Sequence, residues 1–435
     1  MKNILLFGAG KSATVLIQYL ISNASSNQWH ITIVDADEKL IVEKTNQHPA
    51  TTAVQANVTN DIIRTALIKN TDLVISMMPP FLHILIAKDC AQFGKHLLTA
   101  SYADEHIKAL ANDVKSKGII FLCEMGLDPG IDHMSAMQII NKIKDAGGLI
   151  TSFKSHCGGL VAPESDDNPW HYKISWNPRN VVLAGKAGAE YLEDGKIVKV
   201  PYEHLFDETK TIITCNNTIG TLSYYPNRNS LPYIDLYNLQ TAKTFIRTTL
   251  RKQAFMQGWN TIIQLKLTDE DIAYQSDDMS LADFFETHFK KHEINLNLST
   301  EDKFRLQFLG LYDKLTIINK GMISAADGLQ FALEKKLVLS SSDKDMIVMQ
   351  HEIVYEIAQQ KKQTTSALTV IGDDNLHTAM AKTVGLPLGI AAKLILNGAI
   401  TLTGLQLPIC KEIYEPVLIE LAEHAVAFIE ETIDL

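Results

Sequence analysis

A short glycine-bearing segment near the start of the chain has the residue types that cradle a phosphate group. The apolar run Asn3–Phe7 leads into Gly8-Ala9-Gly10-Lys11-Ser12-Ala13. The first glycine permits a tight turn from strand to helix, the second lets backbone approach a pyrophosphate, and a small third residue lets the helix pack closely. The positive end of the helix then faces the phosphates. The segment predicts a dinucleotide-binding site.

One acidic residue sets the expected choice between the two nicotinamide dinucleotides. Asp35 ends the second apolar run, Ile31–Val34, about twenty residues beyond the glycines, as a dinucleotide site requires. A carboxylate at this position accepts a hydrogen bond from a ribose 2′-OH and repels a 2′-phosphate. We therefore expect NAD as the cofactor, with NADP as the alternative.

Two other motifs resemble known sites but lack a required residue. The run Gly10-Lys11-Ser12 matches the end of a P-loop, which needs a glycine where Leu5 stands. The pair His351-Glu352 begins like a zinc protease helix, which needs a histidine where Tyr355 stands. No other spacing typical of metal ligands occurs, so we expect no metal.

Composition argues against several classes of partner and location. The 435 residues carry a formal charge of −10, which gives no electrostatic attraction to nucleic acid or to an anionic membrane. The first expected strand begins at residue 3, which leaves no room for a secretory signal. Five cysteines without Cys-x-x-Cys spacing are expected to be reduced thiols. We expect a cytoplasmic protein that binds neither nucleic acid nor membrane.

Alternating apolar runs and helical segments predict a Rossmann dinucleotide-binding domain over residues 1–133, built on a doubly wound parallel sheet. Beyond Asp35 the expected strands are 52–55, 72–76, 96–99 and 119–122. Ligands of such sheets bind at the carboxyl ends of the strands. The loops at those ends contain Met77, Met78, Pro79, Ser101, Tyr102 and Asp128.

The pattern changes after the dinucleotide domain. Segments rich in β-formers and turn residues predict a second, α/β domain over 134–264 and 329–375, interrupted by a small all-helical insertion at 265–328. The last part of the chain, 376–435, is expected to form two helices, 377–396 and 411–433.

Arginine is scarce, and its distribution is uneven. Of the 40 basic residues six are arginines, and four of them, Arg179, Arg228, Arg247 and Arg251, fall in the second domain. A guanidinium binds a carboxylate in a bidentate fork that lysine cannot reproduce. Arg247 and Arg251 would share one face of an expected helix over 241–258. The cluster predicts a pocket for a substrate with several carboxylates, and incidental surface charge is the alternative.

Three residues have both a chemical and a structural interpretation. Cys157 precedes two glycines that let backbone run close to a ligand, but a buried cysteine also serves as a small hydrophobe. Tyr102 and Asp128 follow strands where a nicotinamide ring projects, yet Asp128 beside Pro129 is also typical of a turn cap. The residue types alone leave both interpretations open.

Six short segments follow one another along the chain at characteristic places. They are Gly126-Leu127-Asp128-Pro129-Gly130-Ile131-Asp132-His133-Met134, Cys157-Gly158-Gly159-Leu160, Tyr225-Pro226-Asn227-Arg228-Asn229-Ser230, Arg247-Thr248-Thr249-Leu250-Arg251, Asp345–Glu352 and Met380–Pro387. Together they resemble the signature blocks of the saccharopine dehydrogenase family of the glutamate-forming type, also called saccharopine reductase. The resemblance implies a homodimer with a Rossmann domain completed by the C-terminal helices, an α/β domain for substrate and dimerisation, and a small helical lid.

The resemblance also implies a reaction in lysine metabolism and the residues that perform it. Saccharopine, NAD(P)+ and water would give glutamate, 2-aminoadipate 6-semialdehyde and NAD(P)H, by hydride transfer from the carbon beside the secondary amine and hydrolysis of the imine. The implied substrate-binding residues are Ser101, Tyr102, Asp128, Arg228, Arg247, Thr248 and Thr249. Trp176 and the backbone of Cys157 and Gly158 would lie near the nicotinamide. Tyr102, Asp128 and Cys157 are the implied acid–base or orienting groups.

Two departures from the family pattern bear on specificity. Fungal members place an arginine-bearing turn where this chain has Asp35-Ala36, which argues against NADP. The family's Arg-Gly-Thr becomes Arg247-Thr248-Thr249, and the added side chain would reshape the carboxylate pocket.

Two other functions remain as alternatives. A related carboxyamine reductase, such as carboxynorspermidine synthase, would act on a diamine and would favour acidic residues where this chain has arginines. A nucleotide-binding regulator without turnover is the other alternative, since common folds host new roles.

Overall fold

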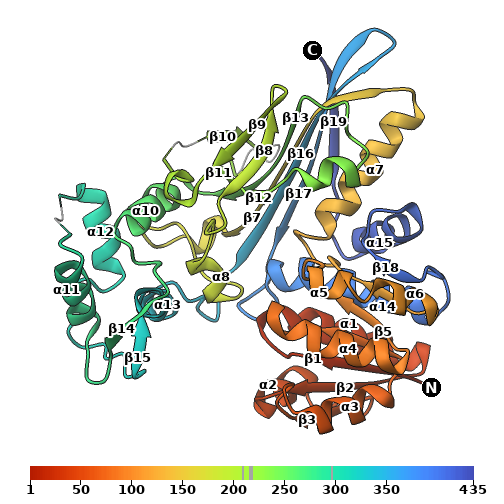
Figure 1. The fold of residues 1–435 in the computed structure, drawn as a ribbon, viewed down its shortest axis with the longest axis horizontal. Coiled ribbons are helices and arrows are strands. Elements are labelled where there is room, and N and C mark those ends of the chain that lie inside the picture. Colours follow the sequence, from red (N-terminus) through yellow and green to blue (C-terminus); the bar gives the residue numbers. More distant parts are fainter. Residues whose placement is uncertain (208–209, 215–218, 295–296) are drawn as a thin grey trace. The chain divides into compact units, whose positions relative to one another are not determined.

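The computed structural model of the chain describes residues 1–207, 210–214, 219–294 and 297–435 (Figure 1). They form two compact units, one of Met1–Gly147 with Leu376–Ile429 and the other of Gly148–Asn375 with Glu430–Leu435. The expected α/β class is confirmed. The division expected at residue 133 falls inside a helix of the first unit, whose Asn141 donates a hydrogen bond of 3.0 Å to Tyr414 near the chain's end.

A seven-stranded parallel sheet forms the centre of the first unit, in the order β18-β6-β5-β4-β1-β2-β3. The strands are β1 (Lys2–Phe7), β2 (Trp29–Asp35), β3 (Thr51–Gln55), β4 (Leu73–Ser76), β5 (His96–Thr99), β6 (Ile120–Leu122) and β18 (Gly404–Gln406). The strands expected from apolar runs are confirmed, because strands covered on both faces need nearly continuous apolar sequence. The edge strand β18 was not expected.

The strand order reverses between β1 and β4, which is the topological switch point of a doubly wound sheet. Phe7 at the end of β1 is paired with Ser76 at the end of β4. The turn that follows β1 and the loop that follows β4 are therefore neighbours. Ligands of open α/β sheets bind in the crevice at this point.

Helices surround this sheet, and polar caps define where several of them begin. They are α1 (Thr14–Asn27), α2 (Glu38–Thr45), α3 (Asp61–Lys69), α4 (His83–Phe93), α5 (Glu105–Lys108), α6 (Ala111–Ser116), α7 (Ile131–Asp145), α14 (Ala379–Leu396) and α15 (Lys411–Glu423). The side chains of Asn60, Asp104 and Thr378 each accept a hydrogen bond from a first-turn amide of the helix that follows.

Helix α14 packs closely on α1 through two glycines. A Cβ at Gly385 would lie 2.9 Å from the backbone nitrogen of Leu16, and one at Gly389 would lie 2.5 Å from the ring of Tyr19. By length and composition α14 could cross a membrane, but 72% of it is buried inside the structure. Such burial is typical of a core helix.

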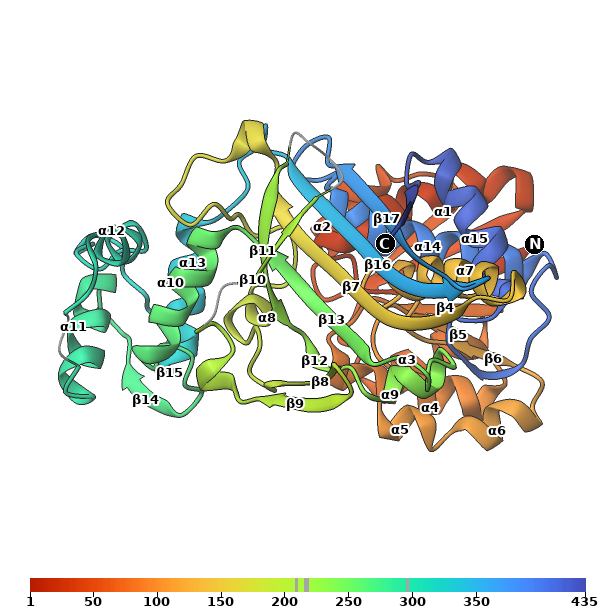
Figure 2. The same cartoon turned by 90° about the horizontal axis from the view of Figure 1, so that it is seen from above.

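The second unit is built on a ten-stranded mixed sheet. Its main path is β10-β11-β13-β7-β16-β17-β19, and β8, β9 and β12 join it beside β13. The strands are β7 (Leu149–Val161), β8 (Ala189–Glu193), β9 (Lys196–Val200), β10 (Lys210–Ile213), β11 (Thr221–Pro226), β12 (Arg228–Asn229), β13 (Thr244–Arg251), β16 (Asp345–Ile357), β17 (Gln360–Ile371) and β19 (Ile429–Asp434). Figure 2 shows the central strands side by side, with β13 parallel to β7 and β16 antiparallel to it.

The insertion at 265–328 is not all helical, contrary to expectation. It contains α11 (Leu281–Lys291) and α12 (Thr300–Phe308), but also a short antiparallel pair, β14 (Ile272–Gln275) and β15 (Met322–Ser324). Strands of three or four residues give too little alternation to be recognised in sequence.

The core of the insertion is shared with the rest of the second unit. The other helices of the second unit are α8 (Pro178–Val182), α9 (Pro232–Leu236), α10 (Gln253–Gln264) and α13 (Ala325–Lys336). Phe284 and Phe285 of α11 belong to the same buried apolar cluster as Trp259 of α10 and Val182 of α8.

Two expected helices were too long. The segment 241–258 contains strand β13 before α10 begins, because the run Thr244–Leu250 is rich in β-branched and aromatic residues that favour strands. The expected final helix ends at Glu423, Ala425 adopts a φ of 60°, and the chain then forms β19.

We predict that Gly385→Ala destabilises the protein, although alanine is the better helix former by about 1 kcal/mol. The new Cβ would meet the backbone of α1, which cannot rotate away as a side chain could. Overpacking of this kind costs about 1–3 kcal/mol, so we expect a net loss of up to about 2 kcal/mol in a denaturation experiment. A stabilised variant would show that the two helices separate easily.

Candidate active site

The turn after β1 has the geometry of a phosphate-binding loop. Gly8 adopts a φ of +99°, and a Cβ there would lie 2.9 Å from the carbonyl oxygen of Met77. Only glycine meets both conditions. Gly10 is exposed, and a Cβ on it would contact nothing within 4 Å, so the loop is open on that side.

The residues after the second glycine start the helix. Lys11–Ala13 form one 3-10 turn that continues into α1, with Lys11 exposed, Ser12 half-buried and Ala13 buried. The small side chain of Ala13 allows this close packing, as the motif predicts. Met77, Met78 and Pro79 are half-buried at the end of β4, next to the turn.

Asp35 lies at the end of β2 and contacts the glycine-bearing loop directly. Its Oδ2 accepts a hydrogen bond of 2.7 Å from the amide of Ala9, and its Oδ1 accepts one of 3.0 Å from the amide of Asp37. The carboxylate is thus fixed where the sequence predicted it. Lys44 of α2 approaches the same loop and donates to the carbonyl oxygens of Ala9 and Gly10.

A buried histidine joins the ends of β4 and β5. One ring nitrogen of His83 lies 2.7 Å from the hydroxyl of Ser76, and the other lies 2.8 Å from that of Ser101. Burial lowers the pKa of His83 to about 4, against the opposing effect of Asp104, so the ring is neutral near pH 7. Ser101 and the adjacent Tyr102 are half-buried. No motif in the sequence predicted a role for His83, because its two hydroxyl partners come together only in the folded chain.

The loop that carries Asp128 is anchored to the same strand ends. Glu124, at a φ of 57°, donates its amide hydrogen to the carbonyl oxygen of Ser101. Its carboxylate lies 2.8 Å from His133, and both side chains are buried. Asp132 accepts a hydrogen bond of 2.6 Å from the amide of Gly130, so it stabilises the turn before α7. Asp128 itself is half-buried between these anchors.

The second unit brings four of the sequence blocks onto adjacent strands. Cys157 lies on β7, paired with Thr249 of β13 on one side and with Met349 of β16 on the other. The amide of Asn227 donates to the carbonyl oxygen of Arg247 over 2.8 Å, which holds the turn bearing Arg228 against β13.

Arg247 and Arg251 share one face of a strand rather than of a helix. Side chains two and four residues apart lie on the same side of a strand, so Thr249 joins them. The pairing of Arg247 with Ser155 and of Thr249 with Cys157 places Cys157 on that face as well. Arg247 is 4% exposed, and its guanidinium lies 4.4 Å from the ring centre of Tyr233.

Thr248 lies on the opposite face of β13 from these residues. Its hydroxyl is 2.7 Å from Nδ1 of His156, and both side chains are buried. Burial lowers the pKa of His156 to about 3, so its ring stays neutral. The added side chain of Thr248 therefore fills a core position and does not join Arg247 and Thr249.

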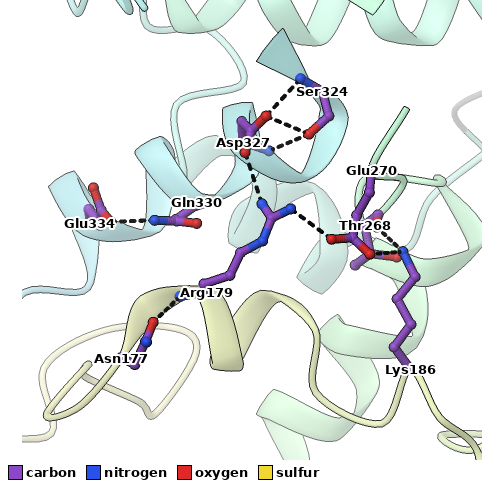
Figure 3. Close-up of polar contacts among 9 residues, drawn as sticks. All are labelled: Asn177, Arg179, Lys186, Thr268, Glu270, Ser324, Asp327, Gln330 and Glu334. Atoms are coloured by element: carbon purple, nitrogen blue, oxygen red, sulfur yellow. Dashed lines mark hydrogen bonds and ion pairs between the residues drawn. The ribbon is translucent and has the colours of Figure 1, made fainter. Parts of the chain in front are cut away.

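Two of the four clustered arginines are occupied within the protein. Arg179 pairs with Asp327 at 2.9 Å and with Glu270 at 2.8 Å (Figure 3). Arg251 stacks on the rings of Tyr172 and Phe255 and donates to backbone carbonyl oxygens. The expected pocket of four arginines therefore does not form as a single group, since Arg179 and Arg251 make these contacts elsewhere, while Arg228 is exposed and Arg247 lies on β13.

The remaining sequence candidates have ordinary surroundings. Trp176 is half-buried, and its indole donates to the hydroxyl of Tyr172 over 3.2 Å. Cys157 is not part of a disulfide, and neither are the other described cysteines, Cys90, Cys123 and Cys410; Cys215 lies outside the described residues.

The fold and the glycine turn define a protein of the nicotinamide-dinucleotide-binding class. The family model described as "Saccharopine dehydrogenase NADP binding domain" matches residues 4–122, and "Saccharopine dehydrogenase C-terminal domain" matches residues 126–426. The chain belongs to the saccharopine dehydrogenase family.

Relatives and a solved structure match the chain end to end. It is 31% identical to the saccharopine dehydrogenase [NADP(+), L-glutamate-forming] of Schizosaccharomyces pombe, over 100% of both chains. The apo saccharopine dehydrogenase (L-Glu forming) of Saccharomyces cerevisiae superposes with a TM-score of 0.87 at 30% identity, again over 100% of both chains. The chain is also 31% identical to the alpha-aminoadipic semialdehyde synthase of Arabidopsis thaliana. This match includes 98% of the chain but 44% of the relative. The chain thus spans less than half of that longer protein.

We predict opposite effects for two neighbouring threonines. Thr248→Val removes the partner of a buried His156 nitrogen, so it should destabilise the protein by about 1–3 kcal/mol and leave the KM for the substrate unchanged. Thr249→Val, on the face with Arg247, should raise KM with little change in Tm. Thermal denaturation and steady-state kinetics of both variants decide the assignment, and the reverse outcome would contradict it.

Proposed function

We propose that the chain is a glutamate-forming saccharopine dehydrogenase. It would oxidise the secondary amine of saccharopine with a nicotinamide dinucleotide and hydrolyse the resulting imine to glutamate and 2-aminoadipate 6-semialdehyde. The observation that carries this proposal is the end-to-end similarity to the two yeast enzymes whose names state this reaction.

The second unit supplies groups suited to the carboxylates of saccharopine. Arg247 is held nearly buried over Tyr233, so little side-chain entropy remains to be lost when a carboxylate binds. Arg228 stands on the turn fixed to the backbone of Arg247, and Thr249 adds a hydroxyl on the same strand face as Arg247. A planar guanidinium forks a carboxylate, which fixes the orientation of the substrate as well as its charge.

The first unit supplies the dinucleotide loop and groups for proton handling. A bound nicotinamide dinucleotide accepts or supplies the hydride. The Ser101 hydroxyl is oriented by His83, and the loop bearing Asp128 is fixed through Glu124. In the proposed reaction Asp128 steadies the positive iminium and Tyr102 orients or relays a proton. By resemblance to the family, Cys157 is a further candidate for an orienting role. A protonated imine is already electrophilic, so placement of charge and water contributes most of the rate.

A spectrophotometric assay tests the proposal. Purified protein with saccharopine and NAD+ or NADP+ should produce reduced cofactor in proportion to the 2-aminoadipate 6-semialdehyde formed. Turnover of a carboxyamine made from a diamine, with saccharopine inert, would favour the carboxynorspermidine synthase alternative. Cofactor binding without turnover of either would favour a regulator.

Oligomeric state and location belong to the proposal as well. By resemblance to the family, the second unit would form a homodimer. A cytoplasmic location is a separate proposal. Light scattering of the purified protein and fluorescence microscopy of a tagged copy would test these two statements.

NAD preference also stays a proposal, because the relatives' names and the family model specify NADP. In this chain Asp35 is held by two backbone amides, so its negative charge cannot swing away from a 2′-phosphate. We predict a higher kcat/KM with NAD than with NADP. Asp35→Ser should raise the NADP/NAD ratio by about tenfold or more, which is the effect of a like-charge contact of about 1.4 kcal/mol. An unchanged ratio in the variant would show that Asp35 does not discriminate between the 2′-hydroxyl of NAD and the 2′-phosphate of NADP.

A second prediction concerns the proposed acid–base groups. Asp128→Asn keeps the size of the side chain but removes its charge, so kcat should fall by at least about tenfold with little change in Tm. Tyr102→Phe should cause a smaller loss, and the two losses should not add if both residues serve one proton path. An Asp128→Asn protein that melts early but turns over normally while folded would identify Asp128 as a turn residue.

A further inference from the structure

Lys44 makes an unusual contact for a lysine on the surface of a Rossmann domain. It stands in the last turn of α2 and reaches back to the loop after β1. Its Nζ donates to the carbonyl oxygen of Ala9 over 2.6 Å and also to that of Gly10. Among the described residues no carboxylate lies within ion-pair distance of Nζ. The ammonium group is therefore half-buried against neutral carbonyl groups.

The contact brings Lys44 close to Asp35, the acidic residue proposed to bind the ribose 2′-hydroxyl. The amide of Ala9 donates to Asp35 while the carbonyl oxygen of the same residue accepts from Lys44. Backbone dimensions limit the two charged groups to a separation of about 9 Å or less. This is within the Debye length of about 10 Å at 0.1 M salt, so the two charges act on the same ligand group. Burial lowers the pKa of Lys44 to about 8, opposed by Asp35 and Glu43, and the amine is mainly protonated at pH 7.

The two charges favour different ligands at the adenosine ribose. A 2′-hydroxyl needs only the acceptor that Asp35 provides, and it gains little from a cation. A 2′-phosphate is repelled by Asp35, but it is a far stronger acceptor for an ammonium group than two backbone carbonyl oxygens are. A lysine stem is flexible enough to exchange one set of acceptors for the other.

We propose that Lys44 is a specificity-determining residue that lets this chain accept a 2′-phosphorylated cofactor despite Asp35. The cation is held on the glycine-bearing loop when the ribose carries a hydroxyl and turns to the phosphate when NADP binds. The inference rests on the dinucleotide use proposed above, and it explains how a chain with an acidic ribose position retains the NADP reaction named for its relatives.

Binding of two small probes to the full-length protein tests this without any turnover. Isothermal titration would compare 2′,5′-ADP, which carries the 2′-phosphate, with 5′-AMP, which lacks it. We expect Lys44→Met to weaken 2′,5′-ADP binding by about tenfold or more and 5′-AMP binding by less than about twofold. Lys44→Arg should restore most of the loss. Lys39→Met is the matched control, because Lys39 is exposed on the same helix, and it should change neither affinity.

The remaining outcomes overturn the proposal. Equal loss of both probes in Lys44→Met would make Lys44 a support of the loop alone. Unchanged affinities, or failure of the wild-type protein to bind 2′,5′-ADP, would remove any role in accepting the phosphate. Because neither probe requires saccharopine, discrimination between them in a protein that does not oxidise saccharopine would support this inference and reject the proposed reaction.

Discussion

The close approach of the turn at Gly8 to Met77 is the constraint on which the first unit depends. Strand β1 is paired with β2 on one side and β4 on the other, so the chain must leave the sheet between two occupied neighbours. A side chain at Gly8 would meet the backbone of the next loop, and the positive φ of this turn is itself open chiefly to glycine. The same turn presents the amide of Ala9 to Asp35 and its carbonyl to Lys44. One backbone conformation thus determines the shape of the crevice and the positions of Asp35 and Lys44 beside it.

Sequence alone predicted much of this unit for a simple reason. Strands buried on both faces need unbroken apolar runs, and the residues that follow them, from Gly8 to Asp35, have few physical alternatives. The same reasoning located the Met77 loop and the loops of Tyr102 and Asp128 correctly at strand ends. It could not find His83, because a histidine in the first turn of a helix has no pattern that distinguishes a link between two strands from an ordinary surface position.

The second unit was harder to predict because its strands have two faces with different neighbours. The segment around Arg247 was expected to be a helix. Residues four apart share a face in a helix and in a strand, so the prediction that Arg247 and Arg251 lie on one face still held. The error mattered for Thr248, since only the alternation of a strand turns it toward His156 and away from Arg247. Arg179 shows a further limit. A count of arginines cannot reveal which of them already have acidic partners when those partners, Asp327 and Glu270, are far away in sequence.

The ion pairs of Arg179 also bear on how the insertion at 265–328 could move. Glu270 and Asp327 lie near the two ends of that insertion, and Arg179 on α8 forms an ion pair with each of them (Figure 3). Beneath them, aromatic side chains of the insertion are packed into the same apolar cluster as α8 and α10. Swinging the insertion away by itself would break both ion pairs and expose those rings to water. Any closing motion in which it takes part must therefore be a rigid-body motion that carries α8 and α10 along, with its hinge outside the insertion.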